Sequence, residues 1–351
     1  FFRLAGGDYF TNFNQDPELG EIPEKIKQLV PENVQLVYWD YFSREQQRYE
    51  KNIDAHNAIK SESWFAGGLW TWAGFAPHNA FAIATMREAM RACRAKGVEN
   101  VVMTMWGDNG AECSKFAVLP ALFMVAQMAR GIDDEETIHA NFEKEFGIPF
   151  EDFRALDLAG TQNDSAEAIY NPEKYLLYCD PFMGQFDNRV KPADAAGYAN
   201  CAARLAKHEH DADYGYLFRS LRALCNFLNI KADLGIRTRA AYLSGDKKTA
   251  KALCTDYDAA LERLDAFYAA YEQQWMHENK PQGFDVVDLR IGGQRQRLLH
   301  CRDRLLAYAE GRLDRIEELE EPVLDCCCEE KADGQATRAI FWHEIASANV
   351  I

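Results

Sequence analysis

Three short apolar runs rich in β-branched and aromatic residues, each followed by a helical stretch, occupy the first 131 residues of the chain. The runs are 34–41 (VQLVYWDY), 64–72 (WFAGGLWTW) and 98–106 (VENVVMTMW). The helical stretches are 43–59, 80–96 and 116–130. Strands that alternate with helices in this way form βαβ units, whose strands lie parallel in one sheet. Three parallel strands leave two open edges, so we expect either a second sheet that completes this one or further strands upstream.

Residues 132–351 have a different hydrophobic pattern, which is helical almost throughout. A charged amphipathic helix is expected over 132–146, followed by a looser segment that contains three prolines. Apolar residues at three- and four-residue spacing predict four long helices over 193–208, 213–243, 247–275 and 289–319. A turn-rich link, 283–293, precedes the last of them. The sequence therefore predicts an α/β region over 1–131 and an all-α domain over 132–351.

The charge of the chain excludes several classes of partner. The 39 basic and 55 acidic side chains give a net charge of −16, and apolar residues make up 48% of the chain. A nucleic-acid binder usually presents a basic surface to the phosphates, and an anionic membrane also attracts basic segments. The longest apolar stretch, 116–126, has about half of the roughly 20 residues that a membrane span needs. We expect neither nucleic acid nor membrane as a partner.

The ten cysteines do not form a disulfide or zinc pattern. Five of them stand singly in helix-like stretches, and no CxxC pair occurs. This favours a reduced protein in the cytoplasm, and no cofactor is expected. The triplet Cys326, Cys327 and Cys328 leaves two interpretations, a metal site or a tail with reactive thiols, of which the tail is the plainer.

Each predicted strand ends in aromatic residues, and two end in a carboxylate. The candidate site residues are Tyr38, Asp40, Trp70, Trp72, Trp106 and Asp108. Side chains alternate along a strand, so Tyr38 and Asp40 share one side, as do Trp70 and Trp72. Aromatic faces stack on sugar rings and carboxylates accept hydrogen bonds from hydroxyls, so the set suits a sugar. The alternative is structural: the aromatics belong to the core and each aspartate caps the following helix.

The runs VQLVYWDYF, GGLWTWAGF and VVMTMWGDNGAEC resemble the later barrel strands of glycoside hydrolase family 20, the β-N-acetylhexosaminidases. The resemblance is greatest to the bacterial branch that has a helical domain after the barrel. It implies that residues 1–131 are the last strands of a (β/α)8 barrel, a partial barrel followed by a C-terminal helical bundle over 132–351. It also implies a glycan that ends in N-acetylhexosamine as the partner.

That family uses substrate-assisted, retaining catalysis, in which the acetamide oxygen of the substrate attacks the anomeric carbon. An Asp-Glu pair completes the reaction: Glu is the general acid and base, and Asp orients the acetamide nitrogen. By resemblance, Tyr38 would bind the acetamide oxygen, and Asp40 and Asp108 would accept bonds from hydroxyls, although the family usually has Glu at the latter position. The resemblance places Trp70, Trp72 and Trp106 around the acetamide group.

The Asp-Glu pair has no counterpart at a strand end of this chain. The adjacent acidic pairs, Asp134-Glu135 and Glu151-Asp152, lie in helix-like segments, and Phe1 to Leu4 resembles the stretch just after the fifth barrel strand. We therefore expect the last part of an exo-acting β-N-acetylhexosaminidase that carries part of the sugar pocket and is inactive alone, because its acid lies upstream.

Two other functions stay open at this point. The chain could be a non-catalytic interaction module that forms a homo-oligomer through its open strand edges. It could also be a different sugar hydrolase that uses Asp40 and Asp108 as its carboxylate pair. Outside the strand ends, Arg290 either reaches a site, in this chain or in a partner subunit, or makes a structural ion pair.

Overall fold

The structure, a computed structural model, describes residues 24–108, 110–162, 171–187, 190–191 and 194–323. The segment Phe1 to Leu4 and the triplet Cys326 to Cys328, on which the sequence analysis made predictions, lie outside these residues. The described chain forms two compact units. The first comprises the described residues up to Trp70 together with His78–Trp106 and Val118–Phe150. The second comprises Thr71–Pro77, Gly107–Ala117 and the described residues from Glu151 onward.

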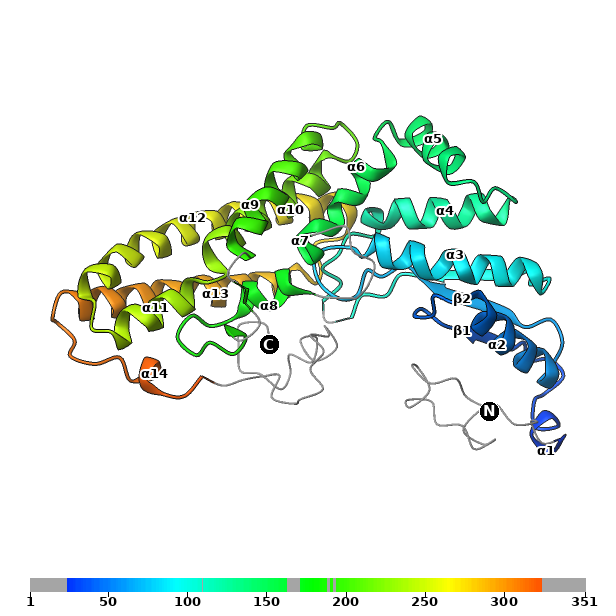
Figure 1. Cartoon of the computed structure of the whole chain (residues 1–351), viewed down its shortest axis with the longest axis horizontal. Helices are drawn as coiled ribbons and strands as arrows, with labels where there is room; N and C mark the ends of the chain where they lie inside the picture. Colours follow the sequence, from blue (N-terminus) through cyan, green and yellow to red (C-terminus); the bar gives the residue numbers. More distant parts are fainter. Residues whose placement is uncertain (1–23, 109, 163–170, 188–189, 192–193, 324–351) are drawn as a thin grey trace. The chain divides into compact units, whose positions relative to one another are not determined.

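A three-stranded parallel sheet, covered by helices on one face, is the only sheet among the described residues and belongs to the first unit (Figure 1). The strands are β1 (Val37–Trp39), β2 (Trp64–Gly68) and β3 (Val101–Thr104), in the spatial order β1-β2-β3. Val37 is paired with Trp64, and Phe65 with Val101. The predicted βαβ arrangement is confirmed, but each strand is shorter than the apolar run that predicted it. The last residues of every run, and the first three of the runs that contain β1 and β3, lie outside the strands.

Helices cover one face of this sheet. The elements of the first unit around it are α1 (Glu24–Lys27), α2 (Gln46–Ile59), α3 (Asn79–Ala95), α4 (Leu119–Ala129) and α5 (Glu135–Phe146). Phe65 of β2 points to the side of α2, where its ring meets Tyr49 edge-on at 5.7 Å between centroids. The alternate positions Val37, Trp39 and Trp64 are 38–42% exposed. The sheet is therefore apolar on both faces, as in a buried parallel sheet, but only one face is covered by described helices.

The second unit is helical, with two strand-end loops embedded in it. Its elements after residue 150 are α6 (Phe150–Arg154), α7 (Leu158–Thr161), α8 (Pro172–Tyr178), α9 (Asp194–Leu205), α10 (Gly215–Lys231), α11 (Leu234–Leu243), α12 (Lys247–Glu278), α13 (Phe284–Ala309) and α14 (Glu317–Glu320). α10 packs on α9 and α12, and α12 packs on α13 (Figure 1). The described chain is thus mostly helical, and a barrel beyond the three strands remains a prediction.

Two helix predictions were wrong in detail. The stretch 213–243 is two helices, α10 and α11, that break at Ala232-Asp233. Both pack on α12, so the apolar periodicity continues across the break and hides it. The expected turn-rich link 283–293 is instead the first part of α13, which ends at Ala309 rather than at 319. Its glycines weaken a helix by about 1 kcal/mol each, which burial of Phe284, Val287 and Ile291 offsets.

The predicted domain boundary, between an α/β region that ends at residue 131 and an all-α domain that begins at 132, stays a prediction. The compact units divide the chain later, after Phe150, and two earlier loops also belong to the second unit. These loops, Thr71–Pro77 and Gly107–Ala117, follow β2 and β3 in sequence but pack with the helices. Among the residues that the structure describes, no helix is both long and apolar enough to cross a membrane.

Two glycines inside helices provide a matched test of the packing. A Cβ added at Gly235 in α11 would lie 2.8 Å from the carbonyl oxygen of Pro181, whereas one at Gly292 in α13 would meet nothing within 4 Å. We expect Gly292→Ala to raise the free energy of unfolding by about 0.5–1 kcal/mol, the gain in helix propensity. Gly235→Ala should lower it by about 1–3 kcal/mol despite the same gain, because the neighbour is backbone. Urea unfolding measures both, and equal effects would contradict the packing of α11.

Candidate functional site

Tyr38 and Asp40 form a hydrogen-bonded pair at the end of β1. The Tyr38 hydroxyl donates to Asp40 Oδ2 at 2.9 Å, and the backbone N–H of Phe42 donates to Asp40 Oδ1 at 2.8 Å. Both side chains are 6% exposed. Burial, and then the charge of Asp40, raises the pKa of Tyr38 far above its usual value, so its hydroxyl remains a neutral donor. The predicted alternation, which puts both side chains on one side, is confirmed.

The pair lies on the helix-covered side of the sheet. The ring of Tyr38 packs against His56 of α2 at 5.0 Å and against Phe65 of β2 at 5.7 Å between centroids. The neighbouring Trp39 points to the other face and is 42% exposed. In this structure Tyr38 thus orients Asp40 from within the core. Its contact with an acetamide group remains a prediction.

Tyr41 joins the ends of all three strands. Its backbone carbonyl accepts a hydrogen bond from Trp70 Nε1 at 3.2 Å, and its hydroxyl accepts one from Trp106 Nε1 at 2.9 Å. Trp70 follows β2 and Trp106 follows β3, while Tyr41 itself follows β1. The sequence analysis did not select Tyr41. The available signal was its position directly after Asp40 in an aromatic strand end.

Three aromatic side chains at this edge are partly open to solvent: Trp39, Phe42 and Trp106 are 42%, 37% and 51% exposed. Trp39 also packs on Tyr41 at 5.3 Å between ring centroids. Aromatic faces of this kind stack against the C–H face of a sugar ring, and the carboxyl edge of a parallel sheet is where ligands of α/β proteins bind. This edge, to which Asp40 also belongs, is the candidate site.

The other two predicted residues, Trp72 and Asp108, belong to the second unit. Trp72 is buried and Asp108 is exposed. The structure therefore brings together four of the six candidates, Tyr38 and Asp40 as a pair and Trp70 and Trp106 through Tyr41. It assigns the remaining two to loops that the helices hold.

The helices hold those loops with buried polar groups. Asn171 Nδ2 donates to the Ala73 carbonyl at 3.0 Å, and Glu173 Oε1 accepts the Ala76 N–H at 3.3 Å. Arg290 pairs with Glu112 at 3.3 Å. Of the two interpretations of Arg290, the structure thus shows the ion pair.

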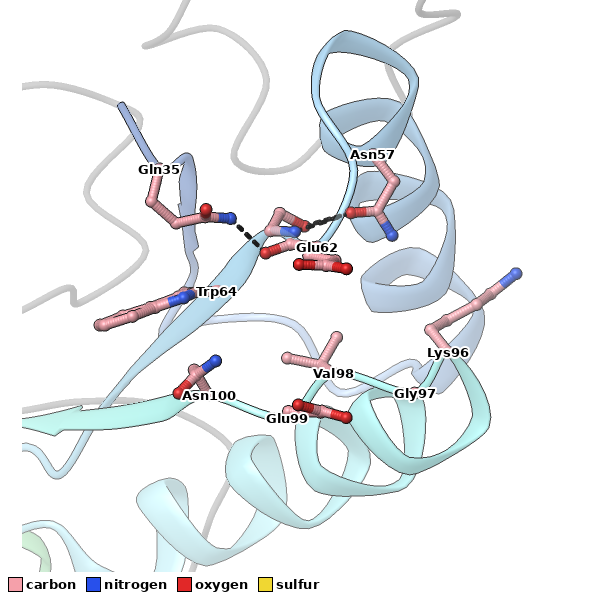
Figure 2. Close-up of a pocket in the computed structure, with 10 residues that line it drawn as sticks. Gln35, Asn57, Glu62, Trp64, Lys96, Gly97, Val98, Glu99 and Asn100 are labelled. Carbon is pink, nitrogen blue, oxygen red and sulfur yellow. Dashed lines mark hydrogen bonds between the residues drawn. The ribbon is translucent and has the colours of Figure 1, made fainter. Parts of the chain in front are cut away.

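A polar cavity of about 330 Å³ lies at the opposite, amino edge of the sheet (Figure 2). Gln35, Glu62 and Asn100 are among the residues that line it, and the side-chain amide of Gln35 donates to the Glu62 carbonyl. Gln35, Glu62 and Asn100 precede β1, β2 and β3, respectively. The cavity therefore lies at the amino ends of the strands, whereas ligands of α/β proteins usually bind at the carboxyl ends. No group of three or more His, Cys, Asp or Glu within the described ranges is placed to hold a metal ion.

Comparison with known families gives one match. A family model described as the Glycoside Hydrolase 20C C-terminal domain matches residues 149–338. Within the described residues, the matched segment contains the helices α6 to α14. It therefore includes α8 and α13, which carry or adjoin the residues bonded to the two strand-end loops. A comparison of the chain with curated proteins finds no match.

The hydroxyl of Tyr41 provides the first test of the site. Tyr41→Phe removes the acceptor of Trp106 Nε1, so we expect the Trp106 indole N–H resonance to shift and its hydrogen exchange to accelerate. The free energy of unfolding should fall by about 1 kcal/mol. Tyr49→Phe is the matched control, because the Tyr49 hydroxyl donates to the Ser43 carbonyl instead. An unchanged Trp106 resonance in Tyr41→Phe would disprove the link between the strand ends.

The buried carboxyl of Glu173 predicts a dependence of stability on pH. Burial raises the pKa of Glu173 from 4.5 to about 7 in the folded chain. Between these two values the folded state holds the proton more tightly than the unfolded state, so stability falls as pH rises through this window and is constant above it. We expect the loss to amount to about 1–3 kcal/mol. Glu173→Gln should abolish this part of the slope in urea unfolding from pH 5 to 8, and parallel curves for the two proteins would refute the assignment.

Proposed function

The chain belongs to the family of glycoside hydrolase 20C C-terminal domains over residues 149–338, and from this premise we propose that it forms part of the sugar site of an exo-acting β-N-acetylhexosaminidase. The match confirms the resemblance to the C-terminal part of family 20 that the strand and helix motifs indicated. It is the observation that carries the proposal, since fold alone does not define a function.

The candidate site supplies the groups that this substrate class needs. The aromatic faces of Trp106 and Trp39 are the proposed stacking surfaces for a sugar ring, and Asp40 is the proposed acceptor for its hydroxyls in this unit. Asp108, in the second unit, is proposed separately as an acceptor for a sugar hydroxyl. Tyr38, kept neutral by burial, holds Asp40 in one orientation. The partner we propose is therefore a glycan with a terminal N-acetylhexosamine.

The acid and base of the reaction are not among these groups. In the substrate-assisted mechanism the acetamide oxygen attacks the anomeric carbon while a general acid protonates the leaving oxygen. Asp134 caps α5 by accepting the Thr137 N–H at 2.8 Å, and Asp152 makes an ion pair with Lys207 at 2.5 Å. The acidic pairs Asp134-Glu135 and Glu151-Asp152 thus make structural contacts in the helical segments. We propose that the acid lies outside the 351 residues and that this chain alone does not hydrolyse a glycoside.

A reducing compartment, the cytoplasm, is proposed as the location. The seven described cysteines are buried free thiols. Burial raises the pKa of Cys93 to about 12 and that of Cys179 to about 11, so these thiols stay protonated and unreactive.

A second candidate function is self-association through the open face of the sheet. Val37, Trp39, Trp64 and Val102 are 38–44% exposed on this face. β1 and β3 also present unpaired edges within the described sheet. Two copies could cover these apolar surfaces in a homo-oligomer. A monomer in sedimentation equilibrium at tens of micromolar would exclude this function.

The proposed sugar site is tested by titration with N-acetylglucosamine and, as the comparison, glucose, which lacks the acetamide. We expect binding of the first sugar, followed calorimetrically, and a loss of about tenfold or more in affinity for Trp106→Ala and Asp40→Asn. Trp64→Ala is the matched control, because Trp64 is an exposed tryptophan at the amino edge of the sheet. Absence of binding, or equal loss in the control, would contradict the site.

Hydrolysis of nitrophenyl N-acetyl-β-glucosaminide tests the position of the acid. We expect no release of nitrophenol by the 351-residue chain, because an absent general acid alone lowers the rate by about 10²–10⁴-fold. The product of the uninterrupted gene provides the positive control. Activity of this chain would place the acid within it and overturn the roles given above.

A further inference from the structure

The loop Gly107–Ala117, which follows β3 and carries Asp108, is anchored in the helical unit by a buried charged group. Glu112 is buried, and its two carboxylate oxygens have separate cationic partners. Lys174 Nζ of α8 lies 2.6 Å from Oε2, and Arg290 Nη1 of α13 lies 3.3 Å from Oε1. The side chains of Glu112, Lys174 and Arg290 are 2%, 1% and 11% exposed, so solvent screens this triad little.

A third helix binds the same loop residue through its backbone. The hydroxyl of Tyr271 in α12 donates to the Glu112 carbonyl at 2.9 Å. Tyr271 also packs edge-on against Phe75 of the other strand-end loop, at 5.2 Å between ring centroids. One helix thus contacts both loops.

A glycine in the loop Gly107–Ala117 leaves room for the side chain of Arg290. Gly110 has φ of +124°, a conformation that side-chain-bearing residues rarely adopt. A Cβ at this position would lie 2.6 Å from Arg290 Nη1. The guanidinium therefore reaches Glu112 across a position where only glycine fits, two residues after Asp108.

Two further bonds fix the part of the loop after Glu112. Ser114 Oγ donates to Glu278 Oε1 at the end of α12, at 2.5 Å. Lys115 Nζ donates to Thr71 Oγ1 at 3.0 Å, which ties this loop to the loop after β2. The helices and the two loops are therefore one bonded assembly.

We infer that Arg290 and Lys174 are positioning residues that act through Glu112 to hold the Asp108 loop in its sugar-binding conformation, so the helical domain sets the geometry of this part of the site. The inference rests on the proposed function, because the ligand of Asp108 is the glycan proposed there. Neither residue needs to touch the sugar. Both cations act through the Glu112 carboxylate, whereas the bonds of Tyr271, Ser114 and Lys115 hold other atoms of the same loop.

The experiment compares Arg290→Met and Arg290→Lys with the unchanged chain. Arg290→Met removes the charge opposite Glu112 Oε1, and we expect hydrogen exchange of 107–117 to accelerate by about tenfold or more while the cores of α12 and α13 stay protected. Affinity for N-acetylglucosamine should fall by about tenfold, since the loop must then be ordered on binding. Arg290→Lys keeps the charge and should recover part of both losses.

Arg297→Met is the matched control. Arg297 lies on the same helix and pairs with Asp180, away from both loops. It should lower stability without changing exchange of 107–117 or sugar affinity. If Arg290→Met leaves both unchanged, or if Arg297→Met changes them equally, the positioning role is overturned. If the unchanged chain binds no sugar, the proposed function fails, whereas accelerated exchange restricted to 107–117 in Arg290→Met would still establish the anchor itself.

Discussion

The Glu112 carboxylate lies almost fully buried between an ammonium group and a guanidinium group that come from two different helices of the second unit. A buried carboxylate with neither partner would cost several kilocalories per mole, so the observed loop conformation depends on the cations that α8 and α13 supply. Tyr271 adds α12 through the backbone of the same residue. Such an arrangement gives little net stability over an apolar core, but it admits few alternative positions of the loop.

The first unit depends on a different kind of contact. Its sheet is apolar on both sides, and the strand ends are joined by tryptophan N–H groups that converge on Tyr41. Tyr41 supplies the acceptors of both indole N–H groups, that of the buried Trp70 and that of the half-exposed Trp106. The aromatic edge is therefore ordered by hydrogen bonds as well as by packing, and a ligand that stacks on a preformed surface of this kind loses little entropy in ordering it.

The sequence was informative where local pattern determines structure. The alternation of runs and helices predicted the parallel sheet, and the two-residue period placed Tyr38 beside Asp40. Two features could not be predicted from pattern. The glycines of 283–293 indicate a turn, and only burial against α12 makes that segment helical. The pairing of Glu112 with Lys174 and Arg290 joins residues 62 and 178 positions apart, and many charged residues in the chain were equally available as partners.

The division of the chain into units that are not continuous in sequence has a consequence for how such a protein can change over time. A gene fusion or recombination event that exchanged the segment after Phe150 for a different helical domain would bring a new surface to loops that were adapted to the old one. Lys174 and Arg290 would leave with the exchanged segment, and Glu112 would remain behind as a buried charge without its partners. We therefore expect that a replacement of the helical segment keeps the fold only if the loops after β2 and β3 are replaced with it.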